Sequence, residues 1–420
     1  MSVRVKLLGG GEEIGRNAIE LSYDGRSILL DYGAAFNSKI EFPLSVNLRN
    51  LAGIIISHAH LDHIGGLPLI YGSAISPRIY YNDITAELMR LLLLDFLKIS
   101  RGNLQFDEVS ISKILEKGEK VPFKSVFNIE NFLIKVGNAG HIPGSWIISV
   151  DVGNKKVLYT GDFNVYDSEL LDGADIIDKD VDLLICESTY ACINHIDRTT
   201  VVNNFIETVI ETLDNNGIVF IPSFSVGRSQ EVLCILRKFN INYPIYLDGM
   251  ARTASNIMLK YPTYFKNYKL LEDSHSFATF INNEKDRKKV VNEPAIIISP
   301  AGMLKGGPAI HYIKKVIASE KNSIVFVGYI AKHTPARTIL ENRILDFENF
   351  KEKVKAKVYW FSLSSHSDMK GIISYIKKVN PRKVLFIHGE PERMIEMVNF
   401  LKEQESIEAT IGKTGESFEI

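Results

Sequence analysis

The chain of 420 residues is poor in cysteine and lacks both a large net charge and a long apolar run. Cys186, Cys192 and Cys234 are too few for a disulfide framework and are not spaced as a zinc knuckle, so we expect a reducing, cytoplasmic environment. The 49 Lys and Arg residues are balanced by 50 Asp and Glu residues, and the formal charge of −1 excludes a globally basic nucleic-acid coat. A local basic groove is still compatible with this composition.

The sequence pattern predicts no membrane segment. The most apolar run, Leu88 to Ile99, is interrupted by Arg90, Asp95 and Lys98, and it is shorter than the ~20 residues that a membrane span requires. The N-terminal residues enter a strand pattern directly, without the regions of a signal peptide. We also find no repeats or low-complexity stretches that would indicate disordered tails.

Three successive patterns of predicted strands and helices along the chain indicate an α/β protein in which one domain is inserted into another. Residues 1–195 read as short strands with few helices, which favours an α+β or αββα sandwich. In residues 196–353, strands rich in Ile and Val alternate with helices, which is typical of a doubly wound parallel sheet with ligand sites at the carboxyl ends of its strands. Residues 354–420 change again, and we predict that they rejoin the first domain.

A cluster of three histidines and an aspartate carries the chemistry. His58-Ala-His60-Leu-Asp62-His63 follows the buried strand pattern of Gly53 to Ser57. Imidazole nitrogens and carboxylate oxygens are suitable zinc ligands. On an irregular loop this spacing can direct His58 and His60 at one metal, and Asp62 and His63 at another. The alternative is a solvated polar turn without a ligand.

Further candidate ligands stand where apolar strands end. His141, Asp162 and His388 each follow such a strand, and an aspartate at 162 can bridge two metals. Asp31 also ends a strand, but it is better placed to orient a ligand histidine than to bind metal itself. A single histidine at a strand end is more often structural, whereas in company with the cluster the metal interpretation is stronger.

These residues, in this order, resemble the metallo-β-lactamase superfamily. The resemblance implies an αββα sandwich with a dinuclear zinc site at its edge. The long interval between Asp162 and His388 is filled by the predicted doubly wound domain, which resembles the β-CASP domain of nucleases in this superfamily. The implied fold is therefore a metallo-β-lactamase sandwich with an inserted β-CASP domain.

Smaller motifs support the same resemblance. They correspond to the family's motifs A, B and C and to two motifs of the inserted domain, and they read Leu184-Ile-Cys-Glu187-Ser-Thr-Tyr190, Phe361-Ser-Leu-Ser-Ser-His366-Ser-Asp368, Ile387-His388-Gly-Glu390, Ile221-Pro-Ser-Phe-Ser-Val-Gly-Arg228-Ser-Gln-Glu231 and Ser299-Pro-Ala-Gly302. A histidine in motif C, His388, is typical of the RNA-processing members. The opening Leu8 to Asn17 resembles archaeal nucleases related to the cleavage and polyadenylation specificity factor, with RNase J next. Two departures are the absence of the N-terminal KH region of many archaeal relatives and the loop Lys332 to Arg337, where many relatives have Gly-Thr-x-Gly-Arg.

The resemblance implies a mechanism with two zinc ions per subunit, about 3.5–4 Å apart, that activate water and clamp a phosphate oxygen. His58, His60, His141 and shared Asp162 would hold the first ion, and Asp62, His63, Asp162 and His388 the second. His366 is cast as the acid that protonates the leaving 3′-oxygen, with Glu187 raising its pKa. A hydrogen bond without catalytic consequence is the alternative for this pair.

Substrate contacts are less specified by the sequence. Ser362, Ser364 and Ser365 could contact phosphate or instead cap a helix from Met369 to Val379. Arg228 and Gly302 are further candidates for RNA contact, with a solvated surface role as the alternative for Arg228. Tyr190, Phe224 and Tyr329 could stack on bases, although packing in the core is the stronger expectation.

We therefore predict a zinc-dependent ribonuclease that cleaves single-stranded RNA and leaves a 5′-phosphate and a 3′-hydroxyl. Both 5′→3′ exonuclease and endonuclease activity are compatible with the sequence. The resemblance further implies a homodimer and partners among RNA-processing or decay factors. Two alternatives are a small-molecule hydrolase, which would turn over a thioester or lactam, and a non-catalytic RNA-binding subunit, which would have lost metal ligands.

Overall fold

The computed structural model describes residues 2–36, 39–100, 102–347 and 350–420, which divide into two compact units. Unit 1 comprises Met1–Asp167, Asp172–Asn194 and His366–Ile420, whereas unit 2 comprises Ser168–Leu171 and His195–Ser365. Unit 2 extends past the predicted boundary at 353/354. Strand β21 (Lys357–Trp360) pairs with a strand of the unit 2 sheet, so that unit 2 continues to Ser365.

Unit 1 is built around two sheets of seven strands each. The first sheet has, in spatial order, β24 (Ser417–Glu419), β1 (Arg4–Gly9), β2 (Ala18–Tyr23), β3 (Arg26–Leu30), β6 (Leu51–Ile55), β7 (Ile79–Tyr81) and β8 (Gly118–Lys120). The second has β23 (Ala409–Ile411), β22 (Lys383–Ile387), β13 (Leu183–Glu187), β12 (Lys155–Tyr159), β11 (Trp146–Val152), β10 (Phe132–Asn138) and β9 (Ser125–Ile129). A short pair, β4 (Ala35–Phe36) and β5 (Ile40–Glu41), lies apart from both sheets.

Alternating side chains of the two sheets form a common core. In β1, Val5 and Leu7 are fully buried, and they join Ile134 of β10 and Trp146 of β11 in one hydrophobic cluster. Strands that bury one face in this way show the period of two that the sequence displays. The core therefore lies between the sheets.

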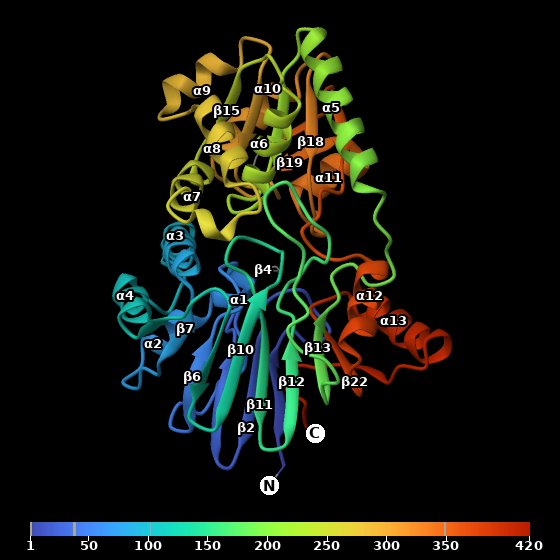
Figure 1. The fold of residues 1–420 in the computed structure, drawn as a ribbon. Coiled ribbons are helices and arrows are strands. Elements are labelled where there is room, and N and C mark those ends of the chain that lie inside the picture. The colour runs from blue at the N-terminus through green and yellow to red at the C-terminus, as the bar shows by residue number, and fades with distance from the viewer. Residues whose placement is uncertain (1, 37–38, 101, 348–349) are drawn as a thin grey trace. The chain divides into compact units, whose positions relative to one another are not determined.

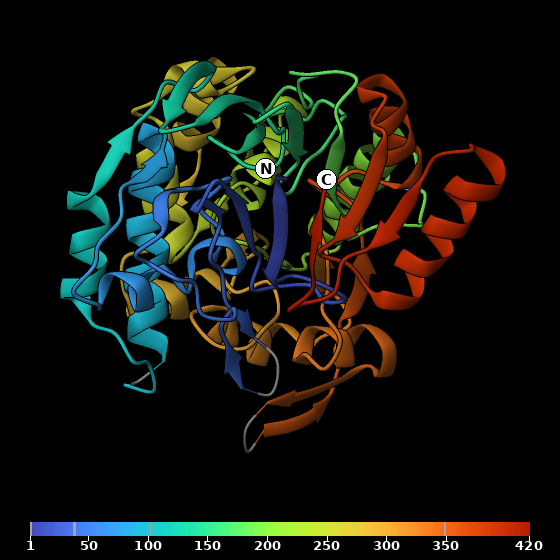
Figure 2. The ribbon, with the colours of Figure 1, turned by 90° about the horizontal axis from the view of Figure 1, so that it is seen from below.

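Helices cover the outer faces of both sheets in unit 1. The helices of this unit are α1 (Leu61–Ile64), α2 (Leu67–Tyr71), α3 (Asp83–Ile99), α4 (Glu108–Glu116), α12 (Met369–Val379) and α13 (Pro391–Gln404), of which α1 is a single turn that does not contribute to this cover. Figures 1 and 2 show α3 and α4 on one side of the sheets and α12 and α13 on the other. Tyr375 of α12 and Met397 of α13 pack with Leu184 and Phe386 of the second sheet. The arrangement is the predicted αββα sandwich.

Unit 2 contains a parallel sheet of six strands. Its spatial order is β16 (Thr279–Phe280), β15 (Ile245–Leu247), β17 (Ile296–Ser299), β14 (Val219–Pro222), β18 (Ser323–Phe326) and β21. The other elements are α5 (Arg198–Asp214), α6 (Arg228–Lys238), α7 (Met250–Met258), the 3-10 helix η1 (Pro262–Tyr264), α8 (Tyr268–Phe277), α9 (Glu284–Val290), α10 (Ala309–Val316), α11 (Pro335–Asn342) and the hairpin of β19 (Ile344–Phe347) and β20 (Phe350–Lys353).

Helices pack on both faces of the unit 2 sheet. Residues of α5 and α6 form one cluster with Val219 and Ile221 of β14, whereas α10 and α11 form another with Phe220. Because both faces are covered, the strands are apolar throughout, as in the fully buried Ile296–Ser299. This is the doubly wound parallel sheet that the sequence predicts. None of the helices that the structure describes has the length and apolar character of a membrane span.

A buried glutamate attaches a short outlying segment to unit 2. Glu231 of α6 is 3% exposed, and its carboxylate accepts hydrogen bonds from the backbone N–H groups of Glu169 and Leu170, both at 3.0 Å. Arg198 forms an ion pair with the same carboxylate. The segment Ser168–Leu171 belongs to unit 2 for this reason, although its neighbours on both sides belong to unit 1.

We expect Glu231→Ala to destabilise unit 2 by about 2–4 kcal/mol, because two backbone donors lose their acceptor and Arg198 loses its counter-charge. Thermal unfolding measures the loss, and hydrogen exchange at the Glu169 and Leu170 amides should accelerate. Glu272→Ala, an exposed position on α8, is the matched control and should leave both readouts unchanged. Equal exchange rates in the two variants would contradict this role of Glu231.

Candidate metal centre

The histidine cluster follows the buried end of β6. His58 and His63 are buried, and His60 is half-buried. Leu61–Ile64 form the one-turn helix α1, in which the N–H groups of His63 and Ile64 both donate to the His60 carbonyl, at 2.9 and 3.1 Å. The expected irregular loop is therefore wrong for Asp62 and His63, whose directions are set by a helical turn.

Close backbone packing holds α1 in place. The Asn17 N–H donates to the Asp62 carbonyl at 2.8 Å, and the Gly33 N–H donates to the Asn17 carbonyl at 2.9 Å. A Cβ atom at Gly33 would lie 1.7 Å from the Asp62 carbonyl oxygen, so only glycine permits this approach. The segments after β1 and β3 thus fix the position from which Asp62 and His63 project.

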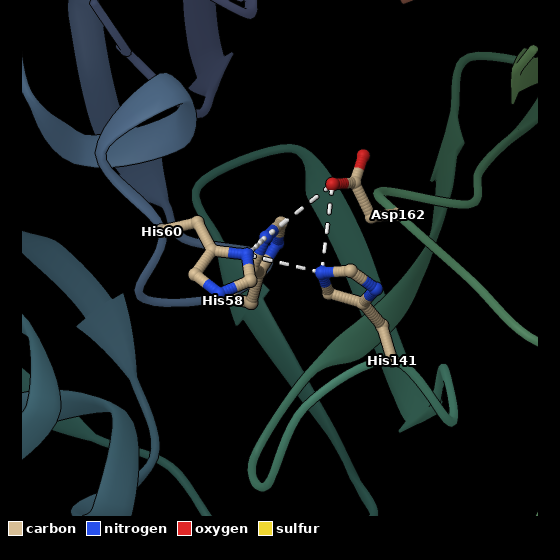
Figure 3. A group of neighbouring side chains, drawn as sticks. All are labelled: His58, His60, His141 and Asp162. Atoms are coloured by element: carbon tan, nitrogen blue, oxygen red, sulfur yellow. Dashed lines mark hydrogen bonds and ion pairs between the residues drawn. The ribbon is translucent and has the colours of Figure 1, made fainter. Parts of the chain in front are cut away.

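Four side chains form the first group of candidate ligands: His58, His60, His141 and Asp162 (Figure 3). His60 Nδ1 lies 3.2 Å from His58 Nε2 and 3.0 Å from His141 Nε2. Asp162 Oδ2 lies 3.6 Å from both of those Nε2 atoms. The four atoms therefore face a common point, although they come from the ends of β6, β10 and β12.

A second group consists of Asp62, His63, Asp162 and His388. Asp162 Oδ1 lies 3.3 Å from His63 Nε2 and 3.2 Å from His388 Nδ1. Asp62 Oδ2 lies 3.3 Å from His388 Nε2. Asp162 belongs to both groups and directs a different oxygen at each.

The geometry of both groups suits a divalent cation. Ligands about 2.0–2.2 Å from a tetrahedral zinc ion lie about 3.3–3.6 Å from one another, close to the separations here. Asp162 is 2% exposed, and its Oδ1 accepts no hydrogen bond from the part of the chain that the structure describes. A buried carboxylate oxygen in that state is costly unless a cation binds it. The residues present therefore fit metal ions.

Protonation within the groups favours metal binding by the first. Burial lowers the pKa of His60 to about 4 and that of His58 well below its ordinary value, so both imidazoles are neutral at pH 7. Burial opposes ionisation of Asp162, but the charges of His388 and His63 outweigh it and hold its pKa well below the ordinary range. Neutral imidazoles and an ionised carboxylate are the forms that bind metal.

Asp31 lies behind the second group. Its Oδ2 lies 2.7 Å from His63 Nδ1 and accepts hydrogen bonds from Ser57 Oγ at 2.6 Å and Tyr159 Oη at 2.8 Å. Asp31 Oδ1 accepts the Ser57 N–H at 2.7 Å. With Nδ1 held in this way, His63 turns Nε2 toward Asp162.

Four residues around the ligands were not identified from the sequence. Ser57 and Tyr159 contact Asp31, Asn17 Nδ2 lies 3.1 Å from His63 Nε2, and Thr189 Oγ1 lies 3.2 Å from His388 Nδ1. Ser57 and Tyr159 precede candidate ligands along the chain, which is a weak signal that could have indicated them. Asn17 and Thr189 lie within the opening motif and motif A, but their contacts with the candidate ligands depend on the three-dimensional arrangement.

His366 and Glu187 form a pair beside both groups. His366 Nδ1 lies 2.8 Å from Glu187 Oε1, and the Glu187 carboxylate, 2% exposed, also accepts the Phe163 and Thr189 N–H groups. Burial acts to lower the pKa of His366, but the Glu187 charge and hydrogen bond outweigh it and raise the pKa to about 9. The rings of His366 and His141 are 4.5 Å apart, so this pair borders the first group.

The predicted substrate contacts Ser362, Ser364, Ser365, Arg228 and Gly302 lie in unit 2. Ser362, Ser364 and Ser365 precede His366, but none of them caps α12, because Asp368 is its N-cap and accepts the Gly371 N–H at 2.8 Å. The capping alternative is therefore wrong. Arg228 and Gly302 line one pocket of unit 2. Tyr190 is 4% exposed and packs in the core, whereas Phe224 is 40% exposed, contrary to the expected core position.

Comparison with protein-family models matches most of the chain in three segments. Residues 229–339 match the Beta-Casp domain, and residues 351–411 match the Zn-dependent metallo-hydrolase RNA specificity domain. Residues 12–199 match the family of the anti-Pycsar protein Apyc1.

Curated relatives align over almost the whole chain. RNase aCSPSF2 of Saccharolobus solfataricus is 34% identical over 100% of this chain and 86% of its own length. Probable RNase MJ4 of Methanocaldococcus jannaschii is 33% identical, covering 98% of this chain and 99% of the relative. Transcription termination factor FttA of Pyrococcus abyssi is 33% identical over 94% of this chain and 68% of the relative.

A solved structure shares the fold. A protein of unknown function from Enterococcus faecalis V583 superposes with a TM-score of 0.64 at 13% sequence identity, and the match covers 100% of both chains. At this identity the likeness concerns the fold alone.

We expect Asp162→Asn to bind roughly half as much divalent metal as the wild type or less, because the amide removes the negative charge and one of the two acceptor oxygens. Mass spectrometry of metals in dialysed protein gives the ratio of metal to chain. Asp172→Asn, an exposed aspartate of unit 1, serves as the matched control and should retain the wild-type ratio. Unchanged metal content in Asp162→Asn would argue against a shared ligand.

Proposed function

Because this chain belongs to the β-CASP family of metallo-β-lactamase-fold proteins, we propose that it is a zinc-dependent ribonuclease acting on single-stranded RNA. Support comes from the RNA specificity domain matched at residues 351–411 and from relatives of nearly equal length that are named RNases. The presence of every candidate ligand disfavours a non-catalytic RNA-binding subunit.

The observation that carries this proposal is the position of Asp162. Its two oxygens face separate groups of nitrogen ligands, and the same residue lies within 4.8 Å of ligand atoms of Glu187 and His366. A single structural ion pair would need neither two histidine groups nor an adjacent histidine with a raised pKa.

We assign two zinc ions to the two groups. His58, His60, His141 and Asp162 would hold one ion, and Asp62, His63, Asp162 and His388 the other, with Asp31 orienting His63. Zinc at such a site supplies Lewis acidity, which lowers the pKa of bound water and polarises a phosphoryl oxygen.

His366 and Glu187 provide the proton that the leaving group needs. Cleavage that leaves a 5′-phosphate and a 3′-hydroxyl requires protonation of the departing 3′-oxygen. His366 is protonated at pH 7, because its pKa is raised, and Glu187 holds the ring through Nδ1, which leaves the Nε2 proton for donation. The Glu187 carboxylate is itself fixed by the Phe163 and Thr189 N–H groups.

Further parts of the proposal concern substrate contacts and the cellular setting. Ser362, Ser364 and Ser365 lie directly before His366 in the chain and are assigned to contacts with RNA phosphates. Three cysteines without disulfides and an RNA substrate favour the cytoplasm. A homodimer, with RNA-processing or decay factors as partners, completes the proposal, and light scattering tests the dimer.

We expect His366→Ala to lower kcat for RNA cleavage by about 10²–10⁴-fold, because the leaving oxygen loses its acid. Metal content should remain at the wild-type level, since His366 belongs to neither ligand group. His275→Ala, on α8 of unit 2, is the matched control and should cleave normally. Wild-type cleavage by His366→Ala would remove the acid from the mechanism.

The pH profile of Glu187→Gln tests the role of the glutamate. His366 donates only while protonated, so cleavage should fall as pH rises through its pKa, about 9 with Glu187 present. Glutamine removes the negative charge that raises this pKa, and the alkaline limb should therefore move to lower pH. An alkaline limb at the wild-type position would mean that Glu187 is purely structural.

Product ends and the mode of attack are read from one RNA digest. New 5′ ends should carry phosphate, so fragments should accept a kinase label only after phosphatase treatment, and direct labelling would contradict the proposed chemistry.

RNA labelled at the 5′ end and carrying either a monophosphate or a triphosphate distinguishes exonuclease from endonuclease activity. Mononucleotide release that triphosphate blocks indicates exonuclease activity, whereas internal fragments from both substrates indicate endonuclease activity.

A further inference from the structure

A pocket lies at the carboxyl edge of the unit 2 sheet, next to its central strand β14. The helix after β14, α6, packs on one face of the sheet, whereas α10 and α11, which follow β17 and β18, pack on the other. Where adjacent strands send their connections to opposite faces, a crevice opens at their carboxyl ends, and ligands of doubly wound sheets bind there. The pocket is lined by the last residues of β14 and β18 and by the segments that follow β14, β17 and β18.

A buried arginine forms one wall of this pocket. Arg228, the first residue of α6, is only 8% exposed and lines the pocket. A guanidinium that is held in a concave site is suited to phosphate, because it stays charged and presents several donors in a planar fork.

Two glycines keep space beside the arginine. A Cβ atom at Gly328 would have Arg228 Nε as its nearest neighbour, at 3.8 Å, so any side chain there would cover the guanidinium. At Gly302 a Cβ would lie 3.4–3.6 Å from backbone atoms of Ser223 and Phe224 and would reduce the space in the pocket. These glycines belong to different loops, after β18 and β17, and both line the pocket.

Aromatic side chains stand beside the same pocket. Phe224 follows β14 and is 40% exposed, and Tyr329 follows β18 and is half-buried. Exposed aromatic rings beside a cationic group are the arrangement with which proteins bind single-stranded nucleic acids, because every base has a face that can stack. The pocket is a shallow depression with room for little more than a water molecule, so a nucleotide would lie over its mouth rather than inside it.

We propose that this pocket binds one nucleotide of single-stranded RNA, with the phosphate at Arg228 and the base against Phe224 and Tyr329. The proposal rests on the ribonuclease function proposed above, because it assigns the same substrate to a second contact, in unit 2. It groups Arg228 and Gly302 with two aromatic residues in a single binding site.

Titration of the zinc-loaded protein with a 20-nucleotide phosphorothioate oligouridine tests the proposal. Each phosphorothioate linkage keeps the negative charge of a phosphate, and a gel run after the titration shows whether the strand has stayed intact. Two matched pairs are compared. Phe224→Ala is set against Phe239→Ala, since Phe239 is 39% exposed at the other end of α6. Arg228→Gln is set against Arg237→Gln, in the last turn of the same helix. Gly328→Val covers the guanidinium without removing it and replaces Arg228→Gln if that variant fails to fold.

Phe224→Ala should raise Kd roughly tenfold, whereas Phe239→Ala should not. Arg228→Gln should reduce the slope of log K against log salt concentration by about 0.7, the contribution of one phosphate contact in a single strand, and Arg237→Gln should keep the wild-type slope. Equal affinities within the phenylalanine pair, together with equal slopes within the arginine pair, would overturn the pocket assignment even if the wild type cleaves RNA. Differences within both pairs in a protein that cleaves no RNA would support the pocket and reject the ribonuclease proposal.

Discussion

The attraction between the Asp162 carboxylate and the imidazoles around it is the interaction on which the site in unit 1 depends. A carboxylate that is 2% exposed is costly to ionise in a protein interior. Here each of its oxygens lies 3.2–3.6 Å from two histidine nitrogens. The first group is electrostatically incomplete without a cation, because the neutral imidazoles of His58 and His60 offer Asp162 lone pairs rather than protons. Metal binding and stability of this region are therefore coupled.

The sheets bring these side chains together through register. Strands β12, β13 and β22 run parallel, with Tyr159 opposite Ile185 and Glu187 opposite Ile387. Their carboxyl ends consequently place Asp162, Glu187 and His388 along one edge, because parallel neighbours end on the same side. The other sheet supplies His58 to His63 from the end of β6, and Asp31 from the end of β3. Precise placement on rigid strand ends permits a ligand set drawn from distant parts of the chain.

Much of this could be predicted from the sequence, because the informative side chains stand directly after apolar strands. The candidate ligands and the two-layer and parallel sheets followed from that pattern and from the resemblance. The sequence pattern does not reveal which strand a given strand pairs with. Lys357 to Phe361 reads as a strand, but only its pairing with β18 assigns it to unit 2. Residues such as Asn17 and Thr189 became visible only through their contacts.

The pairing of strands from opposite ends of the sequence has a consequence for protein synthesis. Strand β24 pairs with β1, and β22, which carries His388 at its end, pairs with β13 (Figure 2). A ribosome releases His195–Ser365 before either late strand, so unit 2 can fold while both sheets of unit 1 are unfinished. His388 emerges last among the seven candidate ligands. Until the ribosome has translated the His388 codon, the nascent chain therefore has an incomplete set of candidate ligands. The proposed nuclease activity can begin only after β22 and β24 have paired with their partner strands.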